Sequence, residues 1–67
     1  MEKCIIAIRK HLKFFYGVDT GVGMRWHKAP GFDPEYLYNN ILNMEEAEIL
    51  RYVKGTFYEE FINENCN

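Results

Sequence analysis

Four of the five glycines and both prolines of this 67-residue chain lie in one stretch, residues 17–34. Glycine and proline both disfavour the interiors of helices and strands, so we expect regular elements on either side of this stretch and an irregular connection within it. The stretch also contains the only tryptophan, Trp26, next to basic residues and a histidine. A chain of this length forms one domain at most, and we predict a single domain over residues 1–67.

Residues 2–16 have the apolar periodicity of an amphipathic helix. With about 100° between successive residues, one arc of this helix carries most of the apolar side chains: Cys4, Ile5, Ile8, Leu12, Phe15 and Tyr16. The adjoining arc carries the basic side chains Lys3, Arg9, Lys10 and Lys13. Ile6 and Phe14 lie outside this pattern. Gly17 stands where a glycine commonly ends a helix.

Two further helices are predicted after the glycine-rich stretch. Asp33 and Pro34 are an N-cap residue and a favoured first residue of a helix, which predicts a helix over about 34–42. A third helix is predicted over about 44–64, because apolar residues recur at helical spacing through Gly55: Leu50, Val53, Phe57 and Phe61. Thr56 followed by Glu59 has the pattern of a capping box, so the alternative is a separate last helix that begins there.

The predicted fold is therefore all-α, with three helices and a long glycine-rich loop, residues 17–33, that has room for a short extended segment at 22–26. The alternative is a small α+β domain, because the β-branched pair Ile5-Ile6 also suits a strand over residues 3–8. The composition favours a dense core, since 48% of the residues are hydrophobic and 16% are aromatic. Dense packing is needed because a chain this short buries only about 60% of its unfolded surface.

The charges are divided unevenly between the two halves of the chain. Residues 1–32 carry six Lys or Arg against two acids, and residues 33–67 carry two against eight. The halves therefore carry +4 and −6, which add up to the net charge of −2. Such a division favours a charged partner, or alternatively a fold in which the two halves attract each other.

The two cysteines, Cys4 and Cys66, are too few for a disulfide framework. We expect both thiols to be reduced in a cytoplasmic protein, because disulfides are rare in that compartment. The alternative is a Cys4–Cys66 disulfide that joins the two ends, since the termini of small domains often lie close together. No apolar segment approaches the roughly 20 residues needed to span a bilayer, and the start of the chain lacks the pattern of a signal peptide.

No motif specific enough to define a reaction occurs in the chain, and we expect neither an enzyme nor a bound cofactor or metal. Asp19-Thr20-Gly21 is the tripeptide of aspartic proteases, but their chemistry needs two carboxylates inside a larger β-structure, so a turn is expected here. The glycine spacing fits neither a dinucleotide fingerprint nor a P-loop. The soft ligands Cys4, His11, His27 and Cys66 lack the paired spacing of a zinc site.

The remaining prediction is a small regulator, inhibitor or adaptor that binds another macromolecule, most simply a protein. Its expected contact residues lie in the loop and on the basic arc of the first helix: Arg25, Trp26, His27, Lys28, Lys10 and Lys13. Trp and Arg are the residue types that most often anchor protein interfaces. A host-directed viral protein or a small bacterial regulator would fit this description, and a homodimer is open.

Two alternatives concern nucleic acid. The basic arc of the first helix with Arg25, Trp26 and Lys28 combines phosphate neutralisation with a ring for stacking, although the sequence pI of about 5.6 is low for such a module. The acidic residues of the last helix could instead imitate nucleic acid and inhibit a basic protein. For Glu45 and Glu46, in a first helical turn, the helix dipole is a sufficient explanation, whereas Glu64 has no such explanation.

Overall fold

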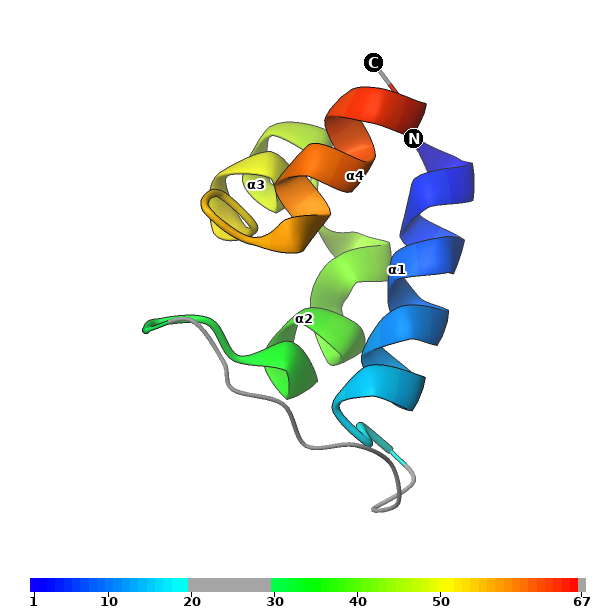
Figure 1. Cartoon of the computed structure of the whole chain (residues 1–67), viewed down its shortest axis with the longest axis vertical. Helices are drawn as coiled ribbons and strands as arrows, with labels where there is room; N and C mark the ends of the chain where they lie inside the picture. The colour runs from blue at the N-terminus through cyan, green and yellow to red at the C-terminus, as the bar shows by residue number, and fades with distance from the viewer. Residues whose placement is uncertain (20–29, 67) are drawn as a thin grey trace.

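The computed structural model describes residues 1–19 and 30–66, which form a mostly helical protein without strands in these ranges (Figure 1). The elements are α1 (Glu2–Phe15), α2 (Pro34–Asn40), a 3₁₀ turn (Ile41–Asn43), α3 (Glu46–Tyr52) and α4 (Phe57–Asn65). The all-α prediction is confirmed. The strand considered over residues 3–8 lies inside α1, so that alternative is wrong, and the extended segment at 22–26 lies outside the described residues.

The local signals around α1 and α2 act as expected. Gly17 follows α1 with a φ of +69°, a backbone conformation that glycine adopts at little cost. The carboxylate of Asp33 accepts hydrogen bonds from the backbone N–H groups of Glu35 and Tyr36, at 3.0 and 3.3 Å. Pro34 is then the first residue of α2. The α-helical turns end at Asn40, and the last residues of the predicted helix form the 3₁₀ turn instead.

The predicted third helix over 44–64 is in fact two helices, α3 and α4. Gly55 has a φ of +84°, which a right-handed helix cannot contain. Thr56 is extended, and its hydroxyl accepts a hydrogen bond from the N–H of Tyr58 at 3.2 Å. The Glu59 carboxylate accepts one from the N–H of Gly55 at 3.0 Å. These side-chain bonds satisfy backbone groups that a new helix start leaves unpaired, so a capped start at Thr56 replaces a continuous helix.

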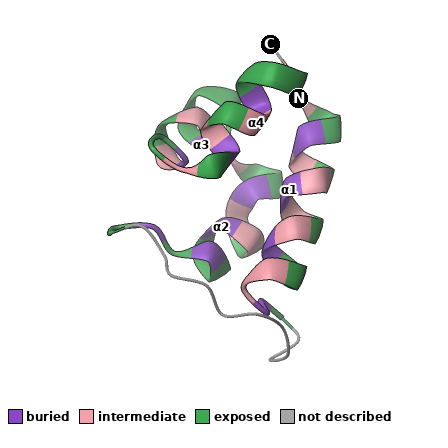
Figure 2. Ribbon diagram, viewed as in Figure 1, coloured by how far each residue is buried: buried purple, intermediate pink, exposed green. Residues whose placement is uncertain are grey.

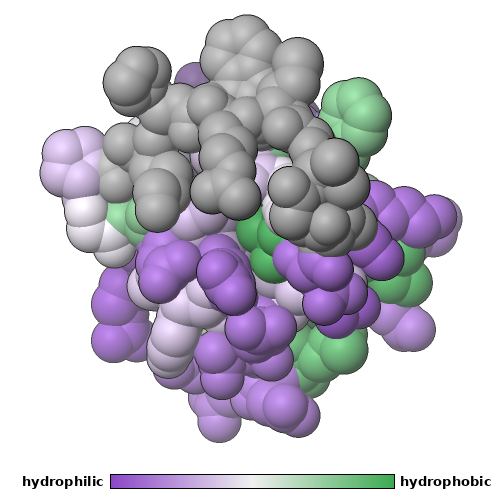
Figure 3. Space-filling model, turned by 90° about the horizontal axis from the view of Figure 1, so that it is seen from below, coloured by the Kyte–Doolittle hydropathy of each residue, from purple (hydrophilic) through white to green (hydrophobic). Residues whose placement is uncertain are grey.

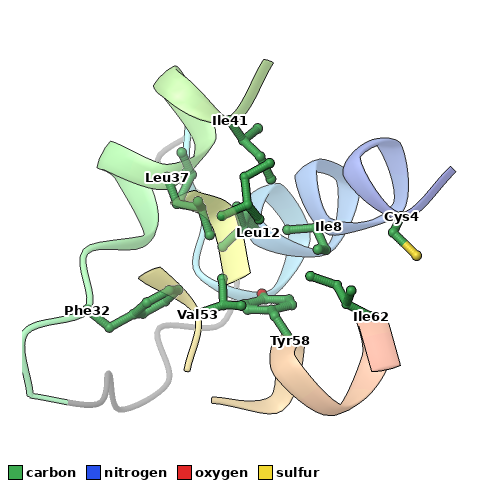
Figure 4. Packing of buried hydrophobic residues seen from close by; sticks show 11 residues of the cluster. Cys4, Ile8, Leu12, Phe32, Leu37, Ile41, Val53, Tyr58 and Ile62 are labelled. Atoms are coloured by element: carbon green, nitrogen blue, oxygen red, sulfur yellow. The ribbon is translucent and has the colours of Figure 1, made fainter. Parts of the chain in front are cut away.

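The core is one cluster to which all four helices contribute, and its side chains point toward one another in Figure 4. It consists of Cys4, Ile8, Leu12, Val18, Phe32, Leu37, Ile41, Ile49, Val53, Tyr58 and Ile62. Figure 2 shows these buried positions on the inner sides of the helices. Full burial of an aliphatic side chain stabilises a fold by about 1.5–3 kcal/mol. On α1 the buried residues follow the predicted apolar arc, whereas Ile5 and Tyr16 at its edge are only partly buried.

The two ends of the chain are joined by a disulfide between Cys4 and Cys66, whose Cα atoms lie 6.5 Å apart. The expectation of two reduced thiols is therefore wrong, and the alternative holds. The two termini lie together because α4 runs antiparallel to the first half of α1 (Figure 1). A bond that closes a loop of 62 residues removes much of the freedom of the unfolded chain, a contribution of about 4 kcal/mol.

Removal of this disulfide is expected to destabilise the fold markedly. The variant Cys4→Ala/Cys66→Ala should lose about 2–4 kcal/mol of unfolding free energy, measured by urea denaturation. Reductant should lower the Tm of the native chain toward that of the variant and leave the variant unchanged. An identical Tm of the native chain with and without reductant would contradict the disulfide.

Candidate partner-binding surface

A concave surface lies between α1 and the region where α2 passes into the 3₁₀ turn, and we call it the basic groove. It encloses about 250 Å³ and is lined by Ile6, Arg9, Lys10, Lys13, Tyr38 and Leu42. Seen from below, the part of the surface not drawn in grey is mostly hydrophilic, with hydrophobic side chains exposed at its edge (Figure 3). The groove therefore combines positive charge with exposed apolar surface.

Arg9 fixes the two walls of the basic groove against each other. Its guanidinium lies over the Tyr38 ring, 4.2 Å from the ring centroid, and its Nε donates a 3.5 Å hydrogen bond to the Tyr38 backbone oxygen. A cation over an aromatic face contributes about 0.5–1 kcal/mol at an exposed site. Arg9 thus serves the contact between α1 and α2, and the cations free to meet a partner are Lys10 and Lys13.

Lys10 and Lys13 are exposed and lie one turn apart on the outer side of α1. In the described parts of the chain, neither ammonium group forms an ion pair with a carboxylate. The acidic side chains of α3 and α4 are likewise mostly exposed. The positive charges of Lys10 and Lys13 are therefore not neutralised by ion pairs with the acidic side chains of α3 and α4.

The apolar part of the basic groove comes from Ile6 and Leu42, which are 49% and 62% exposed. Single exposed apolar residues are ordinary, but these two line one groove. Ile6 is exposed because it lies outside the apolar arc of α1. Leu42 was expected on the apolar face of the second helix, but it lies in the 3₁₀ turn, where three residues rather than 3.6 complete a turn and the side chain faces solvent.

The structure therefore brings two of the predicted contact residues, Lys10 and Lys13, into one surface. The other four, Arg25 to Lys28, lie outside the described residues, and their role stays a prediction. Sequence reasoning missed Ile6 and Leu42 as contact residues. The departure of Ile6 from the apolar arc was a usable signal, whereas the exposure of Leu42 follows from the 3₁₀ turn, which no sequence pattern announced.

A second groove lies between α1 and α4, and we call it the aromatic groove. It encloses about 240 Å³, and its lining is almost entirely apolar: Ala7, Ile8, His11, Phe57, Tyr58 and Phe61. The His11 ring stacks between Phe15 and Phe57, with centroid distances of 4.7 and 5.5 Å. The His11–Phe57 contact joins α1 to α4, whereas the His11–Phe15 contact lies within α1.

A partly buried hydrogen bond joins two residues that line the aromatic groove. The Tyr58 hydroxyl lies 2.7 Å from Nδ1 of His11. Burial, reinforced by the nearby Tyr16, raises the pKa of Tyr58, so its hydroxyl stays protonated. The hydroxyl therefore donates the hydrogen bond and Nδ1 of His11 accepts it. The neutral imidazole therefore carries its own proton on Nε2. Burial also lowers the pKa of His11 from its ordinary value of 6.5.

This pair predicts a pH dependence of stability. Because the folded chain resists protonation of His11, unfolding takes up a proton, and the unfolding free energy should fall as the pH drops below the unfolded pKa of about 6.5. The loss should continue until the pH passes the lower pKa of the folded state. Denaturation by urea at a series of pH values measures this slope.

The matched control is His11→Asn, which keeps an acceptor near the position of Nδ1 but does not titrate. The slope below pH 6.5 should shrink in this variant. A slope that survives unchanged in His11→Asn would assign the effect to another group.

The described part of the chain shows neither a metal site nor a membrane-spanning helix. Among residues 1–19 and 30–66, no three His, Cys, Asp or Glu side chains gather as they would around a metal ion. No helix in the same ranges has the length and apolar character needed to cross a membrane. Comparison with protein-family models, curated proteins and solved structures gives no match. A function for this chain must therefore follow from its own surfaces.

Proposed function

We propose that this chain is a small non-enzymatic interaction protein that binds a protein partner through the basic groove. In this role it acts as a regulator, an inhibitor or an adaptor. The predicted loop contacts Arg25, Trp26, His27 and Lys28 extend the proposed surface on sequence grounds alone. That the chain is not an enzyme is likewise proposed from its sequence, which lacks a motif for catalysis.

The observation that supports the proposal is the pairing of two exposed aliphatic side chains with two unpaired cations in one groove. Ile6 and Leu42 offer apolar area, whose burial drives association. Lys10 and Lys13 favour a partner with carboxylates and would speed its approach. The complementary partner surface is an apolar patch flanked by acidic residues.

Nucleic acid is the alternative partner, since unpaired lysines also bind phosphate. Two observations favour a protein. The apolar lining of the groove offers nothing to a phosphate backbone, and the one arginine in it is already held against Tyr38. The Tyr38 ring is also covered by Arg9, so a nucleic-acid base could not stack well on it.

The cytoplasmic location remains a prediction, and the disulfide weighs against it. Disulfides persist chiefly in oxidising compartments, and they often stabilise small secreted domains. A count of free thiols on the protein isolated directly from its native cell would show whether Cys4 and Cys66 are paired there, and so whether the compartment is oxidising.

The proposal is tested with the variant Lys13→Glu/Leu42→Asp in a tagged pull-down from the native cell. Loss of one apolar contact, reversal of one charge and addition of a second negative charge should weaken capture of the partner by about tenfold or more. The control is Lys54→Glu/Ala47→Asp, which makes the same total charge change at exposed sites on α3 and in the α3–α4 turn, outside the groove. Equal losses in both variants would reduce the effect to net charge and contradict the proposed surface.

A titration with short duplex DNA and RNA at two salt concentrations separates the two partner classes. We expect no binding to either. Affinity that falls steeply with salt, is abolished by Lys13→Glu and is unchanged by Leu42→Ala would replace the protein partner with nucleic acid.

The loop contacts have their own test in the same pull-down. The variant Arg25→Glu/Trp26→Ala should weaken capture if these residues belong to the surface, because Trp and Arg carry a large share of the energy at most interfaces. Full capture by this variant would restrict the surface to the basic groove.

A further inference from the structure

The aromatic groove leaves large apolar side chains uncovered. Phe57 at its rim is 61% exposed, and Phe61 is only partly buried. Phe14, on the same side of α1, is 72% exposed. Aromatic side chains gathered at one apolar groove are typical of a contact surface, since a monomer has little reason to keep them in water.

The two helices that flank this groove carry opposite charges. On α1, Lys3 and Lys10 lie on the stripe that continues to Phe14, at spacings of seven and four residues. On α4, Glu60 and Glu64 lie one turn apart on the outer side of the helix, next to Phe57 and Phe61. The residues that line the groove are apolar apart from His11, and the charged residues lie beyond them on the outer face of each helix, basic on α1 and acidic on α4.

The register of the two helices places these charges level with each other. Cys4 is bonded to Cys66, and His11 is hydrogen-bonded to Tyr58. Because α1 and α4 run antiparallel between these two links, Lys10 on α1 lies at about the height of Glu60 on α4. In the described structure these two side chains form no ion pair within the chain, so both are available.

We infer that the aromatic groove is the contact between two copies of this chain, related by a two-fold axis that runs roughly parallel to α1 and α4. Rotation about such an axis places α1 of one copy on α4 of the other and keeps the height of each residue. Lys10 of each copy then meets Glu60 of the second copy. A two-fold axis across the helices would instead oppose the basic faces of the two α1 helices, which costs free energy.

Symmetry makes this arrangement favourable, because an isologous interface forms every contact twice. Phe14, Phe57 and Phe61 of both copies would leave water together, and apolar burial supplies the association energy. The two charge pairs at the edges select the orientation and suppress the opposite one. Lys10 also lines the basic groove, so the two surfaces adjoin at this residue, whereas Lys13 and Leu42 line only the basic groove and stay open in both copies.

The dimer is tested by sedimentation velocity over micromolar to millimolar concentrations of the chain. The native chain should sediment as a dimer at the upper end. Phe57→Glu should be monomeric over the range or raise the dimer Kd by at least about tenfold, while its circular dichroism stays helical because this side chain is already mostly exposed. A native chain that remains monomeric, or a dimer that survives Phe57→Glu, overturns the inference.

A charge swap tests the orientation. Glu60→Lys alone and Lys10→Glu alone should each raise the dimer Kd, and Lys10→Glu/Glu60→Lys should restore it, since each pair is then rebuilt with its signs exchanged. The matched control is Glu46→Lys, the same change on α3 outside the groove, which should leave the Kd unchanged. A double variant that is no better than the single ones overturns the proposed axis.

The proposed dimer and the proposed partner-binding surface can be tested independently of each other. Lys13→Glu/Leu42→Asp should remain dimeric, because neither residue lines the aromatic groove. Phe57→Glu should still capture a partner through the basic groove. If Lys13→Glu/Leu42→Asp abolished the dimer, the two copies would meet through the basic groove. That result would contradict a two-fold contact through the aromatic groove.

Discussion

The burial of one stripe of α1 is the constraint on which the rest of the structure depends. Cys4, Ile8 and Leu12 are at most 1% exposed, and both α2 and α4 pack against α1. Arg9 over Tyr38 fixes one neighbour, and His11 with Tyr58 fixes the other. Without this stripe the short helices would have no common surface to bury, since helices of seven to nine residues are not stable alone.

Both grooves follow from that arrangement, because each is a seam where α1 meets a neighbour. Within residues 1–19 and 30–66 no further layer covers these seams, and their chemistry is open to solvent. Beside α2 the seam combines lysines with aliphatic side chains, which suits an acidic and partly apolar partner. Beside α4 it combines aromatic rings with opposite charges on its two helices, which suits a second copy of the same surface.

How far the sequence predicted this structure is clearest at single residues. Asp33 and Pro34 predicted the start of α2 correctly, because an N-cap bond is made between neighbours. Gly55 was misjudged because the apolar spacing continues across it, and periodicity does not distinguish a straight helix from two helices that face one core. Thr56 carried the correct signal. Lys10 and Lys13 were predicted as contacts, whereas Leu42 was expected on an apolar helix face.

The sequence by itself determined the all-helical class, the helix boundaries at Gly17 and Asp33, and the position of the positive charge on α1. These features depend on hydrogen bonds and periodicity within a few residues of chain. Only the tertiary structure decided that Cys4 meets Cys66, that Lys10 lies level with Glu60, and that Phe57 stays outside the core. Each of these depends on the angle and register of α1 against α4, which the packing of distant side chains sets and no local pattern encodes.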